Sequence, residues 1–435
     1  MKKVLITTLG CKVNQFESAS FQTGFEERGF TVVRSGSDAD LVVINTCAVT
    51  ASAGAQSRQS IRQALRKNPD ADIIITGCYA EIGARELENE KELLGRRYTI
   101  IGNSEKDRLV NSAFTRSNIE PPAPGAILQA KDICRLPVRR FGDRSRAYLR
   151  VQDGCDSFCT YCIVPFTRGP SRSLPLAEVI EQAKIFHEQG HKEIVLTGIH
   201  LGYYGHDLEP KQDITSLLDL LTRATPEVYY RISSLEPIEI SRQLLQLMAE
   251  RSNIQPHLHI PLQSGDDSIL KKMNRRYTTD QFGDIINLCG EYLPDMAIGI
   301  DILAGFPGET EEHFNNGVRF LQSLDFTYLH VFPYSIRPGT EAARMKGQIS
   351  QKEKEVRVAQ LRLLSDRKKK LFYQNQLGTI RTVLVEGKKD RQGMLKGITD
   401  NYVAVRFKGP DSLLNTLTKV RLDTLQNDHV SATQV

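Results

Sequence analysis

Three cysteines stand close together in the sequence, as Cys155, Cys159 and Cys162. They follow an alternating, strand-like run at 147–152, and the next cysteine downstream is Cys289. A structural zinc site closes with four ligands, whereas three thiolates suit an iron–sulfur cluster that keeps one iron open for chemistry. The alternatives are a zinc ion with a borrowed His or Asp ligand, and a disulfide with a spare thiol.

A second set of cysteines follows three apolar, strand-like runs near the N-terminus, as Cys11, Cys47 and Cys78. In an open parallel sheet, ligands bind beyond the carboxyl ends of the strands, so residues at these ends can meet in space. We therefore expect a second three-thiolate site with an open position. The alternative is that these cysteines are small buried hydrophobic residues, but three equivalent placements argue against it.

The composition fits a soluble globular protein of two or three domains, because the chain has 435 residues, of which 40% are hydrophobic. Its net charge of +5 is only mildly basic. Eight cysteines are too few for a disulfide scaffold, and their clustering favours metal or redox use in a reducing compartment. The first apolar run is shorter than that of a signal peptide, and no run is long enough to span a membrane. We expect a cytoplasmic protein with no membrane association.

Alternation of strand and helix patterns predicts an α/β domain with an open parallel sheet at 1–120. A linker that contains Pro, Gly and several arginines is expected at 121–145. The alternation then repeats six times, with strands predicted at 147–152, 193–198, 228–233, 257–262, 297–303 and 327–333. These units predict a partial (β/α)6 barrel within 146–370, with its chemistry at the carboxyl ends of the strands.

The last segment, 371–435, predicts a small OB-like β-barrel, because short strand patterns are separated by Gly and Asp-Asn turns. Its strands are expected at 379–386, 393–399, 402–408 and 416–421, and the polar end at 427–435 is expected to be frayed. Residues 366–391 hold eight basic and three acidic side chains, a local +5 that equals the excess of the whole chain. A basic helix end that leads into a small barrel indicates RNA binding; a solvated, charged linker is the alternative.

Four basic residues are the candidates for RNA phosphate contacts: Arg58, Arg62, Lys368 and Lys369. The first two share one helix face with Arg66 because of their i, i+4 spacing. A solvated helix face is the alternative for this stripe. Cys134 has no partner at ligand spacing and Cys289 lies in an apolar helical pattern, so neither is expected to bind a metal.

The C-x3-C-x2-C array, with Tyr161 before its last cysteine, resembles the radical S-adenosylmethionine (AdoMet) superfamily. The resemblance implies a [4Fe–4S] cluster on Cys155, Cys159 and Cys162 whose open iron binds AdoMet and yields a carbon radical from it. It also implies AdoMet contacts at the strand ends, with these candidates: Tyr161, Gly198, Ser233, Glu236, Gln263 and Tyr334. The sequence has Thr-Gly-Ile at 197–199, where that superfamily usually has Gly-Gly-Glu. For Ser233, Glu236 and Gln263 the alternative is capping of the strand ends.

The three parts together resemble the methylthiotransferase family from end to end, and the C-terminal segment is similar to its TRAM domain. Four motifs carry the resemblance, at 153–165, 168–172, 259–265 and 337–340. Segment 9–15, Leu-Gly-Cys-Lys-Val-Asn-Gln, is most similar to the branch that acts on N6-threonylcarbamoyladenosine in tRNA. The resemblance implies an auxiliary [4Fe–4S] cluster on Cys11, Cys47 and Cys78 that carries the sulfur to be inserted.

The implied reaction places a methylthio group on C2 of N6-threonylcarbamoyladenosine at position 37 of tRNA, beside the anticodon. Because C2 is an unactivated C–H, a cofactor must carry the radical chemistry while the protein supplies placement. The base must be presented in a loop or flipped out. The implied partners are the anticodon region of tRNA, an electron donor such as flavodoxin or ferredoxin, and a sulfur source.

Other functions fit parts of the same pattern. Within the family, the substrate could be N6-isopentenyladenosine in tRNA or an aspartate of a ribosomal protein. From another class, the chain could be a non-catalytic iron–sulfur regulator that binds RNA without cleaving AdoMet. A zinc-stabilised RNA-binding protein is a third reading, and it predicts zinc in place of iron.

Overall fold

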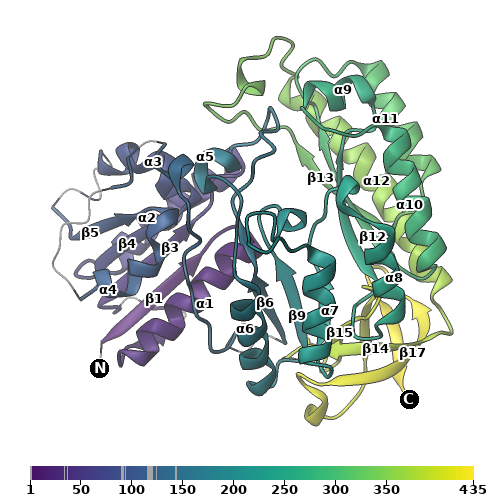
Figure 1. The fold of residues 1–435 in the computed structure, drawn as a ribbon, viewed down its shortest axis with the longest axis horizontal. Helices are drawn as coiled ribbons and strands as arrows, with labels where there is room; N and C mark the ends of the chain where they lie inside the picture. Colours follow the sequence, from purple (N-terminus) through teal and green to yellow (C-terminus); the bar gives the residue numbers. More distant parts are fainter. Residues whose placement is uncertain are drawn as a thin grey trace.

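The computed structural model describes residues 2–33, 35–36, 38–89, 93, 95–114, 121–123, 125–142 and 145–435. Part of the linker expected at 121–145, Arg144 included, lies outside these residues. Three parts follow one another along the chain: a parallel sheet, a set of six parallel strands with helices, and a small barrel (Figure 1). Among the described helices, none combines the length and the apolar character that crossing a membrane requires.

The N-terminal part is an open sheet of five parallel strands in the order β2-β1-β3-β4-β5. Its elements are β1 (Lys3–Thr8), α1 (Lys12–Glu27), β2 (Thr31–Val33), β3 (Leu41–Thr46), α2 (Ala51–Lys67), β4 (Asp72–Gly77), α3 (Cys78–Glu88), β5 (Tyr98–Ile101) and α4 (Leu109–Ser112). Side chains of β3 alternate between the two faces, so Val43 packs in the same core as α1 and Ile44 in that of α2 and α3. The predicted parallel α/β sheet is confirmed.

The central part holds the six predicted strands: β6 (Arg146–Arg150), β9 (Glu193–Thr197), β10 (Tyr229–Ile232), β11 (His257–Gln263), β12 (Ala297–Ala304) and β13 (Tyr328–Pro333). They form two parallel sheets, β10-β9-β6 and β11-β12-β13. Single parallel bridges, Tyr230 to Ile254 and Ser234 to His259, lie between the sheets. A short antiparallel pair, β7 (Gln152–Asp153) and β8 (Arg172–Ser173), brackets the loop that carries the three clustered cysteines.

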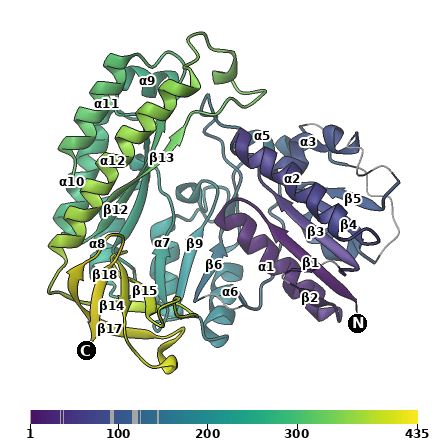
Figure 2. The same ribbon diagram turned by 180° about the vertical axis from the view of Figure 1, so that it is seen from behind.

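Seven helices accompany these strands: α5 (Val164–Arg168), α6 (Leu176–Glu188), α7 (Ile214–Ala224), α8 (Arg242–Glu250), α9 (Asp267–Lys272), α10 (Thr279–Tyr292) and α11 (Glu311–Ser323). Local sequence signals define several of their starts. Asp213, Thr278 and Thr310 cap α7, α10 and α11, each within a capping box that satisfies free backbone N–H groups. Figure 2 shows α10 and α11 along the outer side of β11–β13, together with the long α12 (Gln351–Asn375).

The C-terminal part is a closed barrel in the order β14-β15-β16-β18-β17. Its strands are β14 (Ile380–Val385), β15 (Leu395–Thr399), β16 (Ala404–Phe407), β17 (Leu417–Leu425) and β18 (Val430–Gln434). The expectation of a frayed end at 427–435 is wrong, because β18 pairs with β16 and with β17 and thereby closes the barrel. Val430 supplies the apolar anchor, fully buried in the barrel core, although the segment around it is polar.

Removal of residues 427–435 is expected to open this barrel, because β16 and β17 lose a strand and the core loses Val430. Burial of one such side chain contributes about 1.5–3 kcal/mol. Amide hydrogen exchange of β16 and β17 should therefore accelerate at least about tenfold. A chain shortened only by the exposed Val435 is the matched control. Unchanged exchange in the longer truncation would mean that β18 contributes nothing to barrel stability.

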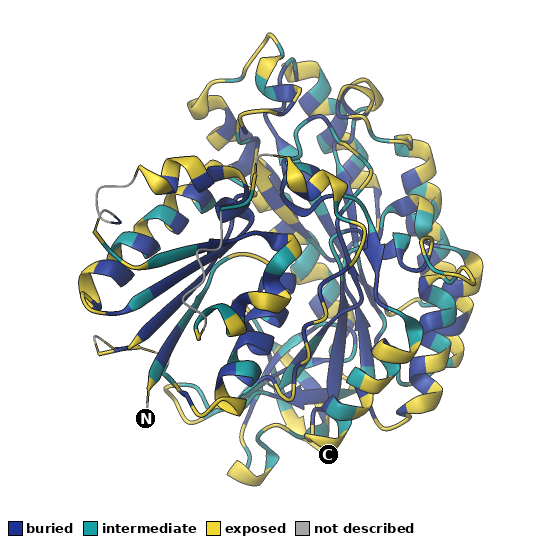
Figure 3. Cartoon of the chain, turned by 60° about the vertical axis from the view of Figure 1, so that its left-hand side comes forward, coloured by how far each residue is buried: buried dark blue, intermediate teal, exposed yellow. Residues whose placement is uncertain are grey.

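The C-terminal barrel packs against the central part around Tyr402. The Tyr402 ring stacks on His257, the first residue of β11, with 4.0 Å between centroids. Arg231 of β10 lies 5.2 Å from the Tyr402 ring and donates hydrogen bonds to the backbone oxygens of Asp400 and Thr399. Figure 3 shows that strands in the interior of the molecule are buried along most of their length. The barrel thus covers the amino-terminal end of β11, and the carboxyl ends of the strands are left for chemistry.

Candidate active site

Cys11, Cys47 and Cys78 come together at the carboxyl ends of three adjacent strands, β1, β3 and β4. The register pairs Thr8 with Asn45 and Thr46 with Gly77, so the chain leaves all three strands at one level. Cys11 caps α1 and Cys78 begins α3, which places both at the positive ends of helix dipoles.

The backbone at Gly10 passes close to the thiol of Cys47. Gly10 has a φ of +96°, and a Cβ on it would lie 3.0 Å from Sγ of Cys47. Burial raises the pKa of Cys47 to about 11, and the nearby Cys78 and Cys11 add to this effect. All eight cysteines of the chain are free. Three converging soft donors that repel one another as thiolates fit a metal cluster, which supplies the missing positive charge.

Arg168 reaches into this site from α5, the helix that follows the second group of cysteines. Its Nε lies 3.3 Å from Sγ of Cys78, its Nη1 2.5 Å from Oε1 of Glu17, and its Nη2 2.5 Å from Oδ1 of Asn14. Arg168 and Glu17 are completely buried. Burial alone would raise the pKa of Glu17, but Arg168 and Lys106 outweigh it and hold that pKa well below its usual range.

Arg168 also ties the two cysteine groups together. Its Nη1 lies 3.3 Å from Oδ2 of Asp153, which stands two residues before Cys155. Sequence reasoning missed Arg168, Glu17 and Asn14 as site residues. The only signal for Arg168 was its place in the motif at 168–172, because the residues that it contacts are far away in the sequence.

The second group of cysteines lies on the loop between β7 and α5. The Cys155 N–H donates to the backbone oxygen of Gly169, and the Cys162 N–H to that of Cys159, both at 2.9 Å. Phe158 adopts a φ of +44°, so the backbone between Cys155 and Cys159 turns sharply. These contacts hold the thiols on one short loop.

Two basic side chains contact this loop. Nδ1 of His200 lies 3.5 Å from Sγ of Cys155, and its Nε2 lies 2.5 Å from Oε1 of Glu239. Burial alone would raise the pKa of Cys155, but the hydrogen bond and charge of His200 outweigh it and lower that pKa. Arg275 donates to Sγ of Cys159 at 3.3 Å. Positive groups thus face two of the three thiols, as expected for thiolates that bind metal.

Comparison with known proteins decides the family. The model of the "Uncharacterized protein family UPF0004" matches residues 3–95, and that of the Radical SAM superfamily matches 149–321. The threonylcarbamoyladenosine tRNA methylthiotransferase MtaB of Bacillus subtilis is 39% identical over 97% of this chain and 94% of its own. The protein of the same name from Aquifex aeolicus is 35% identical over 94% of this chain and 97% of its own. This chain belongs to the methylthiotransferase family of radical AdoMet proteins.

Other similar proteins are named for dimethylallyladenosine. A tRNA-2-methylthio-N(6)-dimethylallyladenosine synthase of Fusobacterium nucleatum is 33% identical over 97% of each chain. Among solved structures, the radical AdoMet methyltransferase TsrM of Kitasatospora setae aligns with a TM-score of 0.58 over 79% of this chain and 75% of its own. At 17% identity that likeness shows the fold alone.

Among the candidate AdoMet residues of this methylthiotransferase, Tyr161 lies on the second cysteine loop, and the others lie at or just after strand ends. Tyr161 and Tyr334 both pack edge-on against Phe306, at 6.5 and 5.8 Å between centroids. Glu236 forms an ion pair with Arg275, which itself contacts Cys159.

Three further candidates sit at the same edge. Gly198 follows β9, Ser233 follows β10, and Gln263 ends β11 with a φ of +67°. Gln152, a residue that sequence reasoning missed, fixes this edge. Its Oε1 accepts from the N–H groups of Ile199 and His200 at 2.9 and 2.8 Å, and its Nε2 donates to the Gly154 oxygen at 2.7 Å. A Cβ on Gly198 would lie 2.7 Å from the same Oε1, so this strand end has no space for a larger residue.

The predicted RNA contacts of this methylthiotransferase receive less support. Lys368 donates to the backbone oxygens of Gln322 and Leu324 at the end of α11, and its ammonium lies 5.3 Å from the Phe326 ring. These contacts favour an intrachain role over phosphate binding. Lys369 lies 5.3 Å from the Tyr373 ring.

The two arginine candidates lie on α2. Arg58 donates to the hydroxyl of Tyr79 at 3.2 Å, and Arg62 is half-buried one turn further along. Cys134 and Cys289 are buried, and Sγ of Cys134 lies 3.5 Å from the backbone oxygen of Asn103.

Proposed function

We propose that this chain places a methylthio group on C2 of N6-threonylcarbamoyladenosine at position 37 of tRNA. One observation carries the proposal: two separate groups of three free cysteines, joined through Arg168, in a chain similar to methylthiotransferases over nearly its full length. Relatives named for threonylcarbamoyladenosine are 32–39% identical, against 31–33% for those named for dimethylallyladenosine. The second substrate is therefore the weaker alternative.

Each cysteine group has a role in this proposal. Cys155, Cys159 and Cys162 would hold the [4Fe–4S] cluster that binds AdoMet, and Cys11, Cys47 and Cys78 an auxiliary [4Fe–4S] cluster. When bound, the two clusters and AdoMet would supply the radical chemistry that an unactivated C–H requires, together with the sulfur and the methyl group.

The protein's own residues position these groups. His200 and Arg275 offset the charge of the thiolates on the second loop, and Arg168 does so at Cys78. Gln152 fixes the backbone at Gly198, beside the place proposed for AdoMet. The other proposed contacts of AdoMet are Tyr161, Ser233, Glu236, Gln263 and Tyr334.

The proposed function also implies an arrangement of domains. We propose that the six central strands act as one partial (β/α)6 barrel, because parallel bridges lie between the two sheets. The C-terminal barrel is proposed to be a TRAM-like, RNA-binding unit. The functional division would be 1–120, 121–145, 146–370 and 371–435.

A cleft of about 690 Å³ supports tRNA as the partner. It lies between α1 and the C-terminal barrel, and its wall includes Gln15, Arg146, Lys388 and Lys396. Glu386 also lines the cleft and pairs with Lys396, and Arg146 pairs with Glu193, so Lys388 is the basic side chain proposed to contact a phosphate there. An electron donor such as flavodoxin or ferredoxin, a sulfur source and a cytoplasmic location complete the proposal.

The test offers three substrates to the anaerobically reconstituted protein with AdoMet, reductant and sulfide. They are tRNA with threonylcarbamoyladenosine, tRNA with isopentenyladenosine, and a ribosomal protein. Nucleoside and peptide mass spectrometry should show a methylthio group on the first substrate only. A methylthio group on either of the other two would show that the assigned substrate is wrong. RNA binding without AdoMet cleavage would instead favour a non-catalytic regulator.

A further inference from the structure

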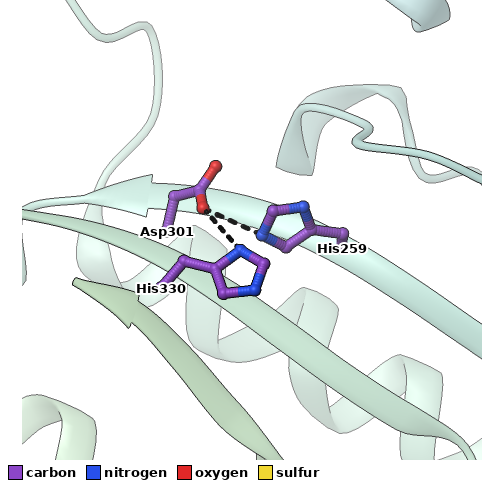
Figure 4. Close-up of side chains that lie close together, drawn as sticks. All are labelled: His259, Asp301 and His330. Carbon is purple, nitrogen blue, oxygen red and sulfur yellow. Dashed lines mark ion pairs between the residues drawn. The ribbon is translucent and has the colours of Figure 1, made fainter. Parts of the chain in front are cut away.

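Three side chains that can bind a metal ion lie together on one face of β11, β12 and β13 (Figure 4). His259 comes from β11, Asp301 from β12 and His330 from β13. Asp301 is paired with His330 in the strand register, and His259 lies two residues before Pro261, the partner of Asp301 on β11. Because side chains two residues apart in a strand share a face, the register brings all three onto one face. We call them the His–Asp–His cluster.

The atoms of the His–Asp–His cluster have the spacing of metal ligands. Nε2 of His259 lies 2.9 Å from Oδ1 of Asp301, and Nδ1 of His330 lies 3.5 Å from the same oxygen. One ligand atom from each residue lies within 4.8 Å of the other two. Ligands about 2.1 Å from one ion are about 3.0 Å apart in octahedral geometry and about 3.4 Å apart in tetrahedral geometry. Both measured separations are close to these values.

The two closest of these atoms are not joined by a hydrogen bond. Nε2 of His259 and Oδ1 of Asp301 are buried, and neither has a hydrogen-bond partner among the described residues. Buried polar atoms are normally paired, so two unpaired ones side by side indicate a bound group. Two ligands of one ion show this arrangement, because each lone pair points at the ion and not at the other ligand.

A hydroxyl group holds the ring of His259 in the orientation that a metal ligand needs. Oγ of Ser234 lies 2.8 Å from Nδ1 of His259, at the parallel bridge between these two residues. When Nδ1 donates its proton to this hydroxyl, Nε2 carries no proton and its lone pair is free to bind an ion. Histidines that bind metals usually form such a hydrogen bond through their second ring nitrogen.

A protonated His259 that forms an ion pair with Asp301 is the alternative. That pair requires the N–H of Nε2 to point at the carboxylate, and no such hydrogen bond is present. Two neutral imidazoles and one carboxylate suit divalent ions of the first transition row. The His330 side chain is 49% exposed, so an ion held here keeps open positions for water or another oxygen ligand.

We propose that His259, Asp301 and His330 bind one divalent ion of the first transition row, with Zn²⁺ held more tightly than Mn²⁺. The ion is separate from the groups held by the six cluster cysteines, because no thiol belongs to its ligand set. It joins β11, β12 and β13 to one another, four residues before the strand end at Gln263. The inference does not rest on the proposed function.

Mn²⁺ is the first probe, because it prefers oxygen and nitrogen ligands to thiolates. Electron paramagnetic resonance of unbound Mn²⁺ is followed while the ion is titrated into the anaerobically reconstituted full chain, freed of excess iron with a chelator. About one ion should bind per chain, and added Zn²⁺ should release it. Asp301→Asn and His330→Ala should abolish this binding. Ser234→Ala should weaken it about tenfold or more, the usual cost of losing such a hydrogen bond.

Two substitutions outside the cluster are the matched controls. Asp284→Asn changes an exposed carboxylate on α10, and His187→Ala changes a half-buried imidazole on α6. Both should bind Mn²⁺ as the wild type does. Far-ultraviolet circular dichroism checks that every variant is folded. Because the His330 ring is half exposed, His330→Ala should keep the fold even if Asp301→Asn does not.

Loss of Mn²⁺ binding in a folded His330→Ala protein, with binding kept in both controls, supports the inference. Equal binding by the wild type and by His330→Ala would overturn it, because the ion would then lie elsewhere. A wild-type protein that binds neither Mn²⁺ nor Zn²⁺ with a Kd below about 1 mM would overturn it as well. The cluster would then be an ion pair between a protonated histidine and Asp301. The readout is metal binding, so it is independent of whether a methylthio product forms.

Discussion

Anaerobically reconstituted protein is expected to contain about eight irons per chain, and about four when Cys11, Cys47 and Cys78 are all replaced by alanine. The same loss is expected for the Cys155/Cys159/Cys162 triple variant. The reason is that each group converges on its own backbone frame: strand ends of the parallel sheet for the first, and the loop before α5 for the second. The two groups share no cysteine, so loss of one group should leave the other cluster in place.

Iron and acid-labile sulfide analysis measures this directly, with electron paramagnetic resonance of the reduced clusters as support. The double variant Cys134→Ala/Cys289→Ala is the control, because both residues are buried free cysteines outside the two groups and their replacement should leave about eight irons in place. About four irons in the native protein would mean that one group binds no cluster. Zinc in place of iron would contradict both assignments.

Arg168→Met is expected to destabilise the fold by about 3–5 kcal/mol, which is the usual cost of removing one partner from a buried ion pair. The substitution removes a cation that the buried carboxylates of Glu17 and Asp153 share, and it removes the guanidinium from Cys78. Arg150 stays as the other cation near both carboxylates. Lys106 still pairs with Glu17 in this variant, so Glu17 should lose only part of its electrostatic stabilisation.

Urea unfolding of the anaerobic protein measures the effect. Arg139→Met is the matched control, because the Arg139 side chain is 73% exposed and its ion pair with Glu27 contributes at most about 1 kcal/mol. A double variant that also carries Glu17→Met should cost less than the sum of the single changes, since the two residues interact directly. Equal shifts for Arg168→Met and Arg139→Met would show that the buried network is not important for stability.

The same network has a pH dependence of known sign. The pKa of Glu17 is depressed in the folded state, so its charge contributes stability at pH values above its ordinary pKa of about 4.3. That contribution is lost as the pH falls from there towards the depressed value. In Glu17→Gln the stability curve should be flatter in this acidic range. A curve as steep as that of the wild type would assign the acid sensitivity to other carboxyl groups.

Features with a local period or a fixed topological rule were predictable from the sequence. The six central strands and the meeting of Cys11, Cys47 and Cys78 depend on apolar runs and on the common edge of parallel strand ends. β18 was missed because one buried side chain, Val430, anchors an otherwise polar segment. Its pairing with β16 depends on barrel closure, which no local pattern encodes.

Contacts between segments far apart in the sequence were beyond such reasoning. Arg168 meets Glu17 across 151 positions, and Arg275 meets Cys159 across 116. The local sequence around an arginine or histidine in a loop does not predict which thiol its side chain will contact. Lys368 is a related case: its basic run predicted RNA contact, and the fold shows that its ammonium donates to backbone oxygens at the end of α11, which the run did not reveal.

The most direct test of the account is nucleoside mass spectrometry of threonylcarbamoyladenosine tRNA after incubation with three proteins. These are the wild type, the Cys11/Cys47/Cys78 variant and the Cys155/Cys159/Cys162 variant, each with AdoMet, reductant and sulfide. We expect methylthiolated threonylcarbamoyladenosine from the wild type alone, because both cysteine groups are needed. Product from either variant, or none from wild-type protein with about eight irons, would contradict it.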